Sequence, residues 1–323
     1  MHLDRMPMTD AREAPVQIET PDAPFAFGKN WARFLASLNE ERIKAAEASL
    51  RNLLQRQDLN GYRFLDAGSG SGLFSLAAYR LGAVVTSFDV DHDSVACTEE
   101  LRRRYATDDD RWRVMRGSLL DQVFLDTLGS FEGVYCWGVA HHSGSMWTAI
   151  ENLLPLVEPD GSIVLAIYND QLYISRVWRA IKHIYHRLPA FLRPLYVVAI
   201  GFSAFAKRLV VTMLACVLRL LTLRNPFVPL MNWATETQSR GMHGWYDLVD
   251  WVGGWPFEVA KPEEVFRFLR DRGFFLEEMT TSAGHGCNEF TFTRTTEKIT
   301  THQSTDADFR TEPKIQPSMS LPG

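Results

Sequence analysis

Residues 63–91 read RFLDAGSGSGLFSLAAYRLGAVVTSFDVD, and this stretch decides the fold. An apolar run ends in Asp66, a loop with three glycines follows, and a helix-compatible stretch leads to a second apolar run that ends in Asp89. Glycine lets the backbone turn tightly and approach a ligand, and the free N–H groups of the next helix face the loop. An acid about twenty residues after such a loop can accept both ribose hydroxyls. The stretch therefore predicts a strand–loop–helix–strand unit that binds an adenosine-containing cofactor.

The spacing of the glycines narrows the choice of cofactor. No Gly-Lys-Ser/Thr follows the loop, which argues against a triphosphate site. The pattern Gly-x-Gly-x-Gly also departs from the dinucleotide fingerprint. Asp66, two residues before the first glycine, would repel a pyrophosphate but attract an ammonium group. A Rossmann-like fold that binds NAD, or no cofactor at all, remains the alternative.

The segment FLDAGSGSGLFSLAA (64–78) resembles motif I of the class I S-adenosylmethionine-dependent methyltransferases. The resemblance continues through VMRGSLLD (114–121), VYCWGVAHHSG (134–144) and EPDGSIVLAIYN (158–169), and extends more loosely over 256–294. It implies S-adenosyl-L-methionine as the cofactor. It also implies an α/β fold with a doubly wound, Rossmann-like sheet of seven strands.

The resemblance further implies which residues hold the cofactor. Asp66 and the glycine loop would hold the methionine end, and Asp89 the ribose. Ser118 and Leu119 would flank the adenine. The full set of expected cofactor-binding residues is Asp66, Gly68, Ser69, Gly70, Gly72, Asp89, Val90, Ser118, Leu119, Trp137, Gly138 and Val139.

Apolar runs and helical patterns alternate along the chain, which indicates a doubly wound sheet with ligands at the carboxyl ends of its strands. Asp93 or Ser94 is expected to cap a helix that runs to Tyr105, and Gly161 to close a helix around 146–157. Strands are expected at 63–66, 83–89, 113–115, 133–137, 162–168, 274–280 and 288–294, and further helical segments at 31–57, 72–81 and 262–272.

An insert after the fifth strand, residues 171–235, contains no Asp or Glu but nine Lys or Arg. The remaining chain holds 25 basic and 39 acidic residues, a balance of −14, so the overall charge of −5 hides a strong asymmetry. The segment 174–188 reads as an amphipathic helix with Ile174 and Trp178 on its apolar face and Arg176 and Lys182 on its basic face. Two apolar runs follow, 195–206 and 209–218, split by Lys207 and Arg208, and each is too short to span a bilayer.

Two interpretations of this insert remain open and are compatible. It is either a helical lid that packs on the domain or a contact with a membrane surface through 174–224. A basic face beside apolar helices suits a lipid-like or small apolar substrate. The runs are more apolar than an RNA-binding face requires, so the nucleic-acid signal is weak.

Composition divides the chain into five parts. We expect a loose tail at 1–24, the cofactor-binding core at 25–170, the insert at 171–235, an aromatic loop and the last strands at 236–295, and a second tail at 296–323. The four cysteines are widely spaced, as in a reducing compartment, and the N-terminus lacks an apolar signal core. The expected location is the cytoplasm, peripheral to the inner face of the membrane.

Candidate catalytic and substrate-binding residues lie at the same expected edge of the sheet. His142 is the first candidate for a base and His141 the second, because WGVAHHSG follows the fourth strand. The glycine-rich segment 240–260 is expected to be loop-like rather than helical throughout. Its aromatic and acidic side chains, together with one amide later in the chain, give the candidate substrate residues His243, Trp245, Tyr246, Asp247 and Asn288. No metal motif is found.

Taken together, the sequence predicts an enzyme, an S-adenosylmethionine-dependent methyltransferase. A looser similarity to quinone- and lipid-pathway O-methyltransferases implies transfer to a hydroxyl of a small apolar or lipid-like biosynthetic intermediate. One alternative is a methyltransferase that acts on RNA or protein and docks through the basic insert. The second alternative is a non-catalytic protein that keeps the cofactor-binding fold.

Overall fold

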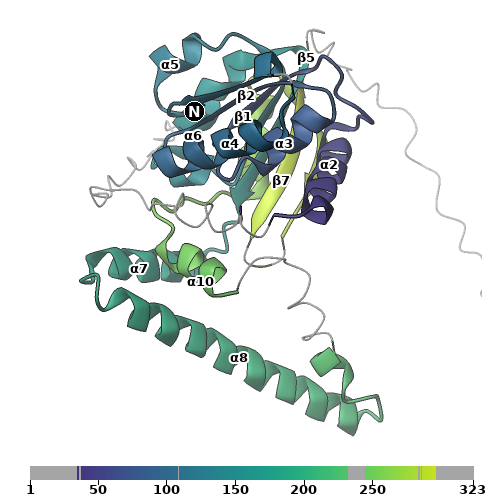
Figure 1. The fold of residues 1–323 in the computed structure, drawn as a ribbon. Helices are drawn as coiled ribbons and strands as arrows, with labels where there is room; N and C mark the ends of the chain where they lie inside the picture. Colours follow the sequence, from purple (N-terminus) through teal and green to yellow (C-terminus); the bar gives the residue numbers. More distant parts are fainter. Residues whose placement is uncertain are drawn as a thin grey trace, which may run out of the picture.

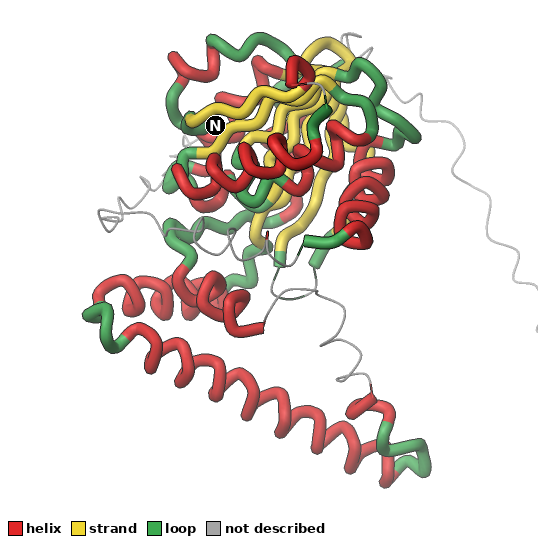
Figure 2. The backbone as a smooth tube through the Cα atoms, in the orientation of Figure 1, coloured by secondary structure: helices red, strands yellow, loops and turns green. Residues whose placement is uncertain are grey.

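A seven-stranded mixed sheet lies at the centre of the molecule (Figures 1 and 2). The computed structural model describes residues 35, 38–107, 109–231, 244–282, 284 and 286–295. The strand order is β3-β2-β1-β4-β5-β7-β6, in which the first five strands are parallel and β7 is antiparallel to both of its neighbours. The strands are β1 Arg63–Ala67, β2 Val84–Asp89, β3 Trp112–Arg116, β4 Phe131–Trp137, β5 Val157–Tyr168, β6 Phe274–Thr280 and β7 Cys287–Arg294. The doubly wound, Rossmann-like fold expected from the sequence is confirmed.

Helices cover both faces of this sheet. One face carries α2 Glu40–Leu54, α3 Leu73–Arg80 and α4 His92–Tyr105, and the other carries α5 Gln122–Asp126, α6 Met146–Leu153 and α11 Pro262–Arg270. Three short 3-10 helices, η1 Asp109–Arg111, η2 Ala140–His142 and η3 Leu154–Leu156, join these elements.

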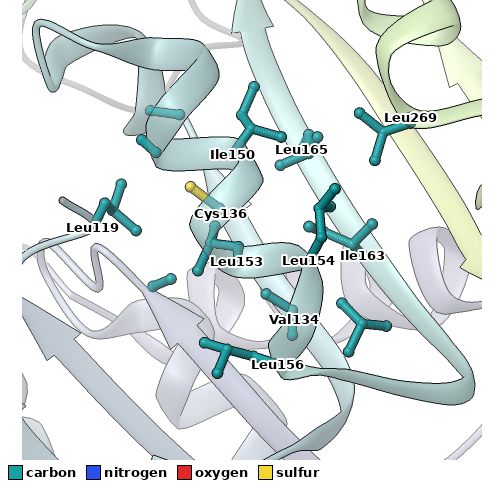
Figure 3. Close-up of a cluster of buried hydrophobic side chains, with 14 of the residues drawn as sticks. Leu119, Val134, Cys136, Ile150, Leu153, Leu154, Leu156, Ile163, Leu165 and Leu269 are labelled. Atoms are coloured by element: carbon teal, nitrogen blue, oxygen red, sulfur yellow. The ribbon is translucent and has the colours of Figure 1, made fainter. Parts of the chain in front are cut away.

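Each central strand therefore supplies two cores, because successive side chains point to opposite faces. In β5, Val164 belongs to the core under α2 and α3, whereas Ile163 and Leu165 belong to the core under α6 and α11. Figure 3 shows the second core, in which Ile163 and Leu165 meet Ile150 of α6 and Leu269 of α11. Burial on both faces explains why the sequence of β5 is an almost continuous apolar run.

Two predicted helix boundaries are wrong. Helix α4 begins at His92 and is capped by Asp91, whose side chain accepts a hydrogen bond from Asp93 N at 2.8 Å, so neither Asp93 nor Ser94 is the cap. Helix α6 ends at Leu153, because Pro155 cannot continue an α-helix. Gly161 does not close it and lies instead in β5, where the register with β4 shifts.

Among the described residues, the insert forms helices α7 Tyr173–Arg187 and α8 Arg193–Leu221, and α10 Gly244–Gly253 follows it and packs on both. The two apolar runs predicted as separate are one helix of 29 residues, because neither Lys207 nor Arg208 interrupts the backbone hydrogen bonds of a helix. The expectation that 240–260 is loop-like is wrong for the part that forms α10. Its aromatic and branched residues lie at helical spacing, which outweighs its two terminal glycines.

Helix α8 lies away from the sheet, beyond α7 and α10 (Figure 1). Its first turns pack on both helices through Val197, Tyr196 and Ile200, in a cluster that also contains Val252 of α10 and Tyr185 of α7. The remainder of α8 exposes many large apolar side chains, including Phe202, Val210, Leu214, Val217 and Leu221. The described part of α8 is therefore not a lid over the core.

Candidate active site

The loop between β1 and α3 has a backbone that only glycine adopts readily. Gly68, Gly70 and Gly72 have φ values of 87°, 53° and 78°. A Cβ at Gly68 would lie 2.4 Å from Cγ1 of Val139, and one at Gly72 would lie 2.8 Å from Cα of Thr98. The N–H groups of Gly68 and Ser69 donate to the carbonyl of Phe88 at 2.8 and 3.0 Å, which fixes the loop to the end of β2.

Asp89 is joined directly to this loop. Its Oδ2 accepts a hydrogen bond from Gly70 N at 2.9 Å, and its Oδ1 accepts one from Asp91 N at 2.9 Å. Burial raises the pKa of Asp89, and these two backbone N–H groups oppose that shift. The acid at the end of the second strand therefore lies beside the loop, where a carboxylate can accept hydroxyl groups of a ribose.

Asp66 lies in the interior rather than at an open mouth of the loop, and it is 3% exposed. Its Oδ2 accepts a hydrogen bond from Ser75 Oγ at 2.5 Å, Ser87 Oγ donates to Ser75 Oγ at 2.7 Å, and Trp112 Nε1 donates to Ser87 Oγ at 2.9 Å. Burial raises the pKa of Asp66 to about 7, and the hydrogen bond from Ser75 opposes this rise. The acid expected to meet an ammonium group is thus held in a buried polar network of three other side chains.

The remaining expected cofactor residues surround the same edge of the sheet. Ser118 and Leu119 follow β3, where Ser118 Oγ accepts from Leu120 N at 3.2 Å and Leu119 is buried. Trp137 is 40% exposed at the end of β4, and no atom lies within 4 Å of a Cβ built on Gly138. The structure therefore brings the expected residues to the carboxyl ends of β1 to β4. The glycine turns and the buried carboxyl groups fit an adenosine-containing cofactor.

The histidine pair lies in η2, directly after β4. His142 Nδ1 is 2.6 Å from the carbonyl oxygen of Pro256. Because a carbonyl can only accept, Nδ1 of the neutral ring carries the proton and Nε2 does not. Burial, and after it the charge of Lys182, lowers the pKa of His142 to about 3. His142 is therefore neutral at physiological pH.

His141 is fully buried, and its ring centroid lies 3.9 Å from that of Tyr168. Within the part of the chain that the structure describes, neither ring nitrogen of His141 has a partner with good hydrogen-bond geometry. Burial lowers its pKa well below the usual histidine value, and the nearby His142 and Lys182 add to this effect. Burial of an uncharged imidazole without such partners is costly.

Sequence reasoning missed two residues of this edge, Tyr168 and Lys182. Tyr168 is the last residue of β5, and the rule that ligands bind at the carboxyl ends of strands could have found it. Lys182 was placed on an exposed basic face, which is wrong because it is fully buried. Its Nζ donates to the carbonyl of Trp251 and lies 4.9 Å from the ring centroids of Trp251 and Phe257.

The orientation of α7 has a physical cause. Lys182 binds the carbonyl of Trp251, and His186 Nε2 lies 2.7 Å from the carbonyl of Gly253, so α7 caps the carboxyl end of α10. As a consequence, the predicted apolar face is partly exposed to solvent: Ile174 is 45% exposed, Val177 39% and Ile184 46%.

Of the five predicted substrate residues, Asn288 is the one whose side-chain contacts the structure describes. His243 lies outside the described residues. Trp245, Tyr246 and Asp247 fall on the first turn of α10, and the placement of their side chains is not described. Asn288 is 1% exposed; its Oδ1 accepts from Ser282 N at 2.9 Å and its Nδ2 donates to Asn169 Oδ1 at 3.1 Å. These contacts tie Asn288, near the start of β7, to Ser282 and to Asn169 directly after β5.

No group of three or more His, Cys, Asp or Glu that could hold a metal ion is found among the described residues.

The sheet order, the glycine loop and the carboxyl group that binds it define a Rossmann-like protein with an adenosine-cofactor site. A family model described as a methyltransferase domain matches residues 33–195, half of the chain. The chain therefore belongs to the class I S-adenosylmethionine-dependent methyltransferase family.

Similar proteins carry names consistent with this family. A ubiquinone biosynthesis O-methyltransferase of Xanthomonas oryzae pv. oryzae is 29% identical over 135 residues, which cover 42% of this chain and 52% of that protein. The mitochondrial ubiquinone biosynthesis O-methyltransferase of Bos taurus is 27% identical over 139 residues, covering 42% of this chain and 37% of that protein. The chain thus spans about half the length, or less, of these relatives.

Among solved structures, the magnesium protoporphyrin IX methyltransferase of Synechocystis PCC 6803 matches with a TM-score of 0.46 and 15% sequence identity. The match covers 85% of this chain and 90% of that one.

Proposed function

We propose that this protein transfers the methyl group of S-adenosyl-L-methionine to a hydroxyl of a small apolar or lipid-like biosynthetic intermediate. One observation carries the proposal: the cofactor loop and the histidine pair are joined through Val139. The side chain of Val139 covers Gly68, and its carbonyl accepts a hydrogen bond from His142 N at 2.8 Å. The proposed donor and acceptor sides therefore meet at one edge of the sheet.

The residues of this edge have distinct proposed roles. When bound, S-adenosyl-L-methionine supplies the electrophilic methyl group. Asp66, the glycine loop and Asp89 bind and orient the cofactor, whereas Trp137, Gly138 and Val139 line the transfer site. His142 accepts a hydrogen bond from the acceptor hydroxyl at Nε2, with His141 as the second candidate. Because the lowered pKa of His142 makes it a weak base, orientation of the hydroxyl contributes more than proton removal.

The acceptor class follows from the insert and from the names of the relatives. The insert exposes an apolar surface, which favours an apolar acceptor over a polar metabolite or a nucleic acid. Both curated relatives are named for ubiquinone biosynthesis.

The test is methyl transfer from isotopically labelled cofactor to a lipid extract, a polar extract and a macromolecular fraction, followed by mass spectrometry. We expect label in the lipid extract and a loss of at least about tenfold in rate for His142→Ala. His92→Ala, at a histidine whose side chain is 81% exposed, is the matched control and should remain active. Label confined to RNA or protein, or binding of S-adenosylhomocysteine without any transfer, would contradict the proposal.

We further propose that the protein works in the cytoplasm, attached peripherally to the inner face of a membrane through 174–224. Helix Arg193–Leu221 is long and apolar enough to cross a bilayer, with a mean hydropathy of 1.8 over its most apolar window, and that window is only 12% buried. The exposed apolar side chains of α7, Ile174, Val177 and Ile184, add to the same surface.

Charge favours a helix that lies in the membrane plane. Lys207 and Arg208 are at the middle of α8, and a charged residue at the bilayer centre costs about 2.5–3.5 kcal/mol. The helix is also about 43 Å long, beyond the roughly 30 Å of a hydrocarbon core. A second copy of the chain is a poor partner for this surface, because the acid-free insert would bring like charges together. An anionic lipid surface complements them.

Flotation with vesicles tests this surface. The protein should float with vesicles that contain anionic lipid and much less with neutral vesicles. Lys207→Glu/Arg208→Glu should remove most of the binding, while Arg42→Glu/Lys44→Glu on α2 carries the same charge change and should bind normally. Equal binding by both double variants, or dimerisation without vesicle binding, would rule out the membrane role.

A further inference from the structure

A buried lysine of the insert reaches the catalytic edge through two aromatic rings. The Nζ of Lys182 lies 4.9 Å from the ring centroids of both Trp251 and Phe257. Both rings also pack on Tyr168, with centroid distances of 5.2 and 5.5 Å. Tyr168 in turn contacts the rings of His141 at 3.9 Å and His142 at 5.3 Å. The insert and the histidine pair therefore share one packed cluster.

Trp251 and Phe257 belong to one segment, 251–258, and the backbone of this segment binds the histidine pair directly. The Pro256 carbonyl lies 2.6 Å from His142 Nδ1, and Glu258 N donates to the His141 carbonyl at 3.0 Å. The Glu258 carboxylate accepts from Met146 N, at the start of α6, at 3.0 Å. One end of this segment is thus held by Lys182, through the Trp251 carbonyl, and the other end holds the histidines.

We propose that Lys182 is a positioning residue for methyl transfer: by fixing segment 251–258 it holds the Pro256 carbonyl against Nδ1 of His142 and so keeps Nε2 as the unprotonated nitrogen. This inference rests on the proposed function, because it gives the insert a part in the same reaction. The insert then completes the histidine site in addition to contacting the membrane.

The electrostatics of the cluster act in the same direction. Among the described residues, the titratable groups that face His142 are His141 from η2, Tyr168 from β5 and Lys182 from α7. The Glu258 carboxylate of the segment after α10 is bound instead to Met146 N. The charge of Lys182 disfavours the protonated imidazole and adds to the effect of burial in lowering the pKa of His142. Removal of this charge must therefore raise the pKa of His142.

The test is nuclear magnetic resonance of the full chain with ¹⁵N-labelled histidine, in which the His142 signals are assigned by their loss in His142→Gln. In a titration from pH 3 to pH 8 we expect the wild-type protein to show a single tautomer with the proton on Nδ1 and a protonation midpoint of about 3. Lys182→Met should raise the protonation midpoint by about one pH unit or more, or produce a mixture of tautomers. Lys182→Arg, which keeps the charge, should restore most of the wild-type spectrum.

The matched control is Arg187→Met, which removes one charge from an exposed position of the same helix and should leave His142 unchanged. A wild-type His142 spectrum in Lys182→Met would overturn the proposal. If Lys182→Met does not fold, Phe257→Leu removes one of the two rings and should shift the tautomer balance of His142; an unchanged spectrum would again overturn it. Absence of methyl transfer by the wild-type protein would instead refute the proposed function, since the spectra do not depend on activity.

Discussion

At the scale of single residues, two acids near one glycine loop have different environments and therefore different properties. Asp89 accepts hydrogen bonds from two backbone N–H groups, whereas Asp66 accepts a hydrogen bond from a serine hydroxyl inside the core. The sequence predicted both positions, because the loop and the strand ends are local patterns. It could not predict the buried network behind Asp66, because Ser75, Ser87 and Trp112 come from three different elements.

Asp66→Asn should make the stability of the protein less sensitive to pH. The pKa of Asp66 is about 7 in the folded chain and about 3.9 when unfolded, so the folded state favours the protonated form. The stability from this group is fully present below about pH 3.9 and is lost as pH rises through about 7. In urea unfolding at pH 5, 6.5 and 8, the free energy of unfolding of Asp66→Asn should rise relative to that of the wild type by up to a few kcal/mol as the pH increases.

The control for this prediction is Glu277→Gln, which removes a carboxylate at an exposed position. If the difference in free energy of unfolding between Asp66→Asn and the wild type stays constant from pH 5 to pH 8, then Asp66 is ionised throughout this range. The same variant should bind S-adenosylhomocysteine more weakly if the carboxylate meets the ammonium group of the cofactor.

Asp89→Ala should weaken the binding of S-adenosylhomocysteine by about 1–3 kcal/mol, the scale of a lost charged hydrogen bond. The substitution removes the ribose acceptor and also releases Gly70 N from its 2.9 Å contact. Isothermal titration calorimetry measures the affinity, with Asp93→Ala on the first turn of α4 as the control. Wild-type affinity in Asp89→Ala would exclude this carboxylate from the cofactor site.

At the scale of elements, prediction succeeded where local pattern and tertiary contacts agree. The strands of the core and the capped helix Pro262–Arg270 follow from apolar runs and end signals. Helix α7 was predicted in place, and Trp178, Ile181 and Tyr185 of its predicted apolar face do pack on α8 and α10. The predicted exposure of Lys182 is wrong, because α10, far along the chain, offers carbonyls that Lys182 and His186 bind. Helix α8 was predicted as two separate segments because Lys207 and Arg208 interrupt the apolar pattern, although they do not interrupt the backbone hydrogen bonds of the helix.

Helix α6 shows how a remote residue stabilises an element. The side chain of Ser145, at its N-cap, makes no capping hydrogen bond, and Glu258 supplies the acceptor for Met146 N instead. Glu258→Ala should therefore lower the free energy of unfolding by about 0.5–2 kcal/mol, and Glu258→Gln by less, because the amide keeps an acceptor. Chemical unfolding followed by tryptophan fluorescence measures this, and an unaffected Glu258→Ala would remove the assigned capping role.

At the scale of the whole molecule, two large cores on the sheet are accompanied by a small third cluster in the insert. This third cluster uses only the beginning of α8, so the exposed remainder contributes little to folding. The presence of an insert was visible in the sequence through its missing acids. Its arrangement was not, because it depends on contacts among α7, α8 and α10 that are distant in the chain.

Deletion of 203–243, with a Gly-Ser linker of about eight residues in its place, should leave the sheet domain intact. Gly201 lies beside Leu248, so a short linker suffices to rejoin the chain. We expect the midpoint of urea unfolding and the affinity for S-adenosylhomocysteine to stay close to those of the full chain, and vesicle flotation to be lost. A large drop in the unfolding midpoint would show that the deleted segment belongs to the folded core.

The separation of charge between insert and core has a kinetic consequence. A body with nine cationic side chains at one end and an excess of fourteen negative charges elsewhere behaves as a strong electric dipole. The electric field of an anionic membrane therefore orients the protein before contact, with the apolar helix α8 facing the lipid and the acidic domain facing away from it. Added electrolyte should slow the arrival of the protein far more than it hastens its departure, since apolar side chains already sunk among acyl chains are insensitive to screening.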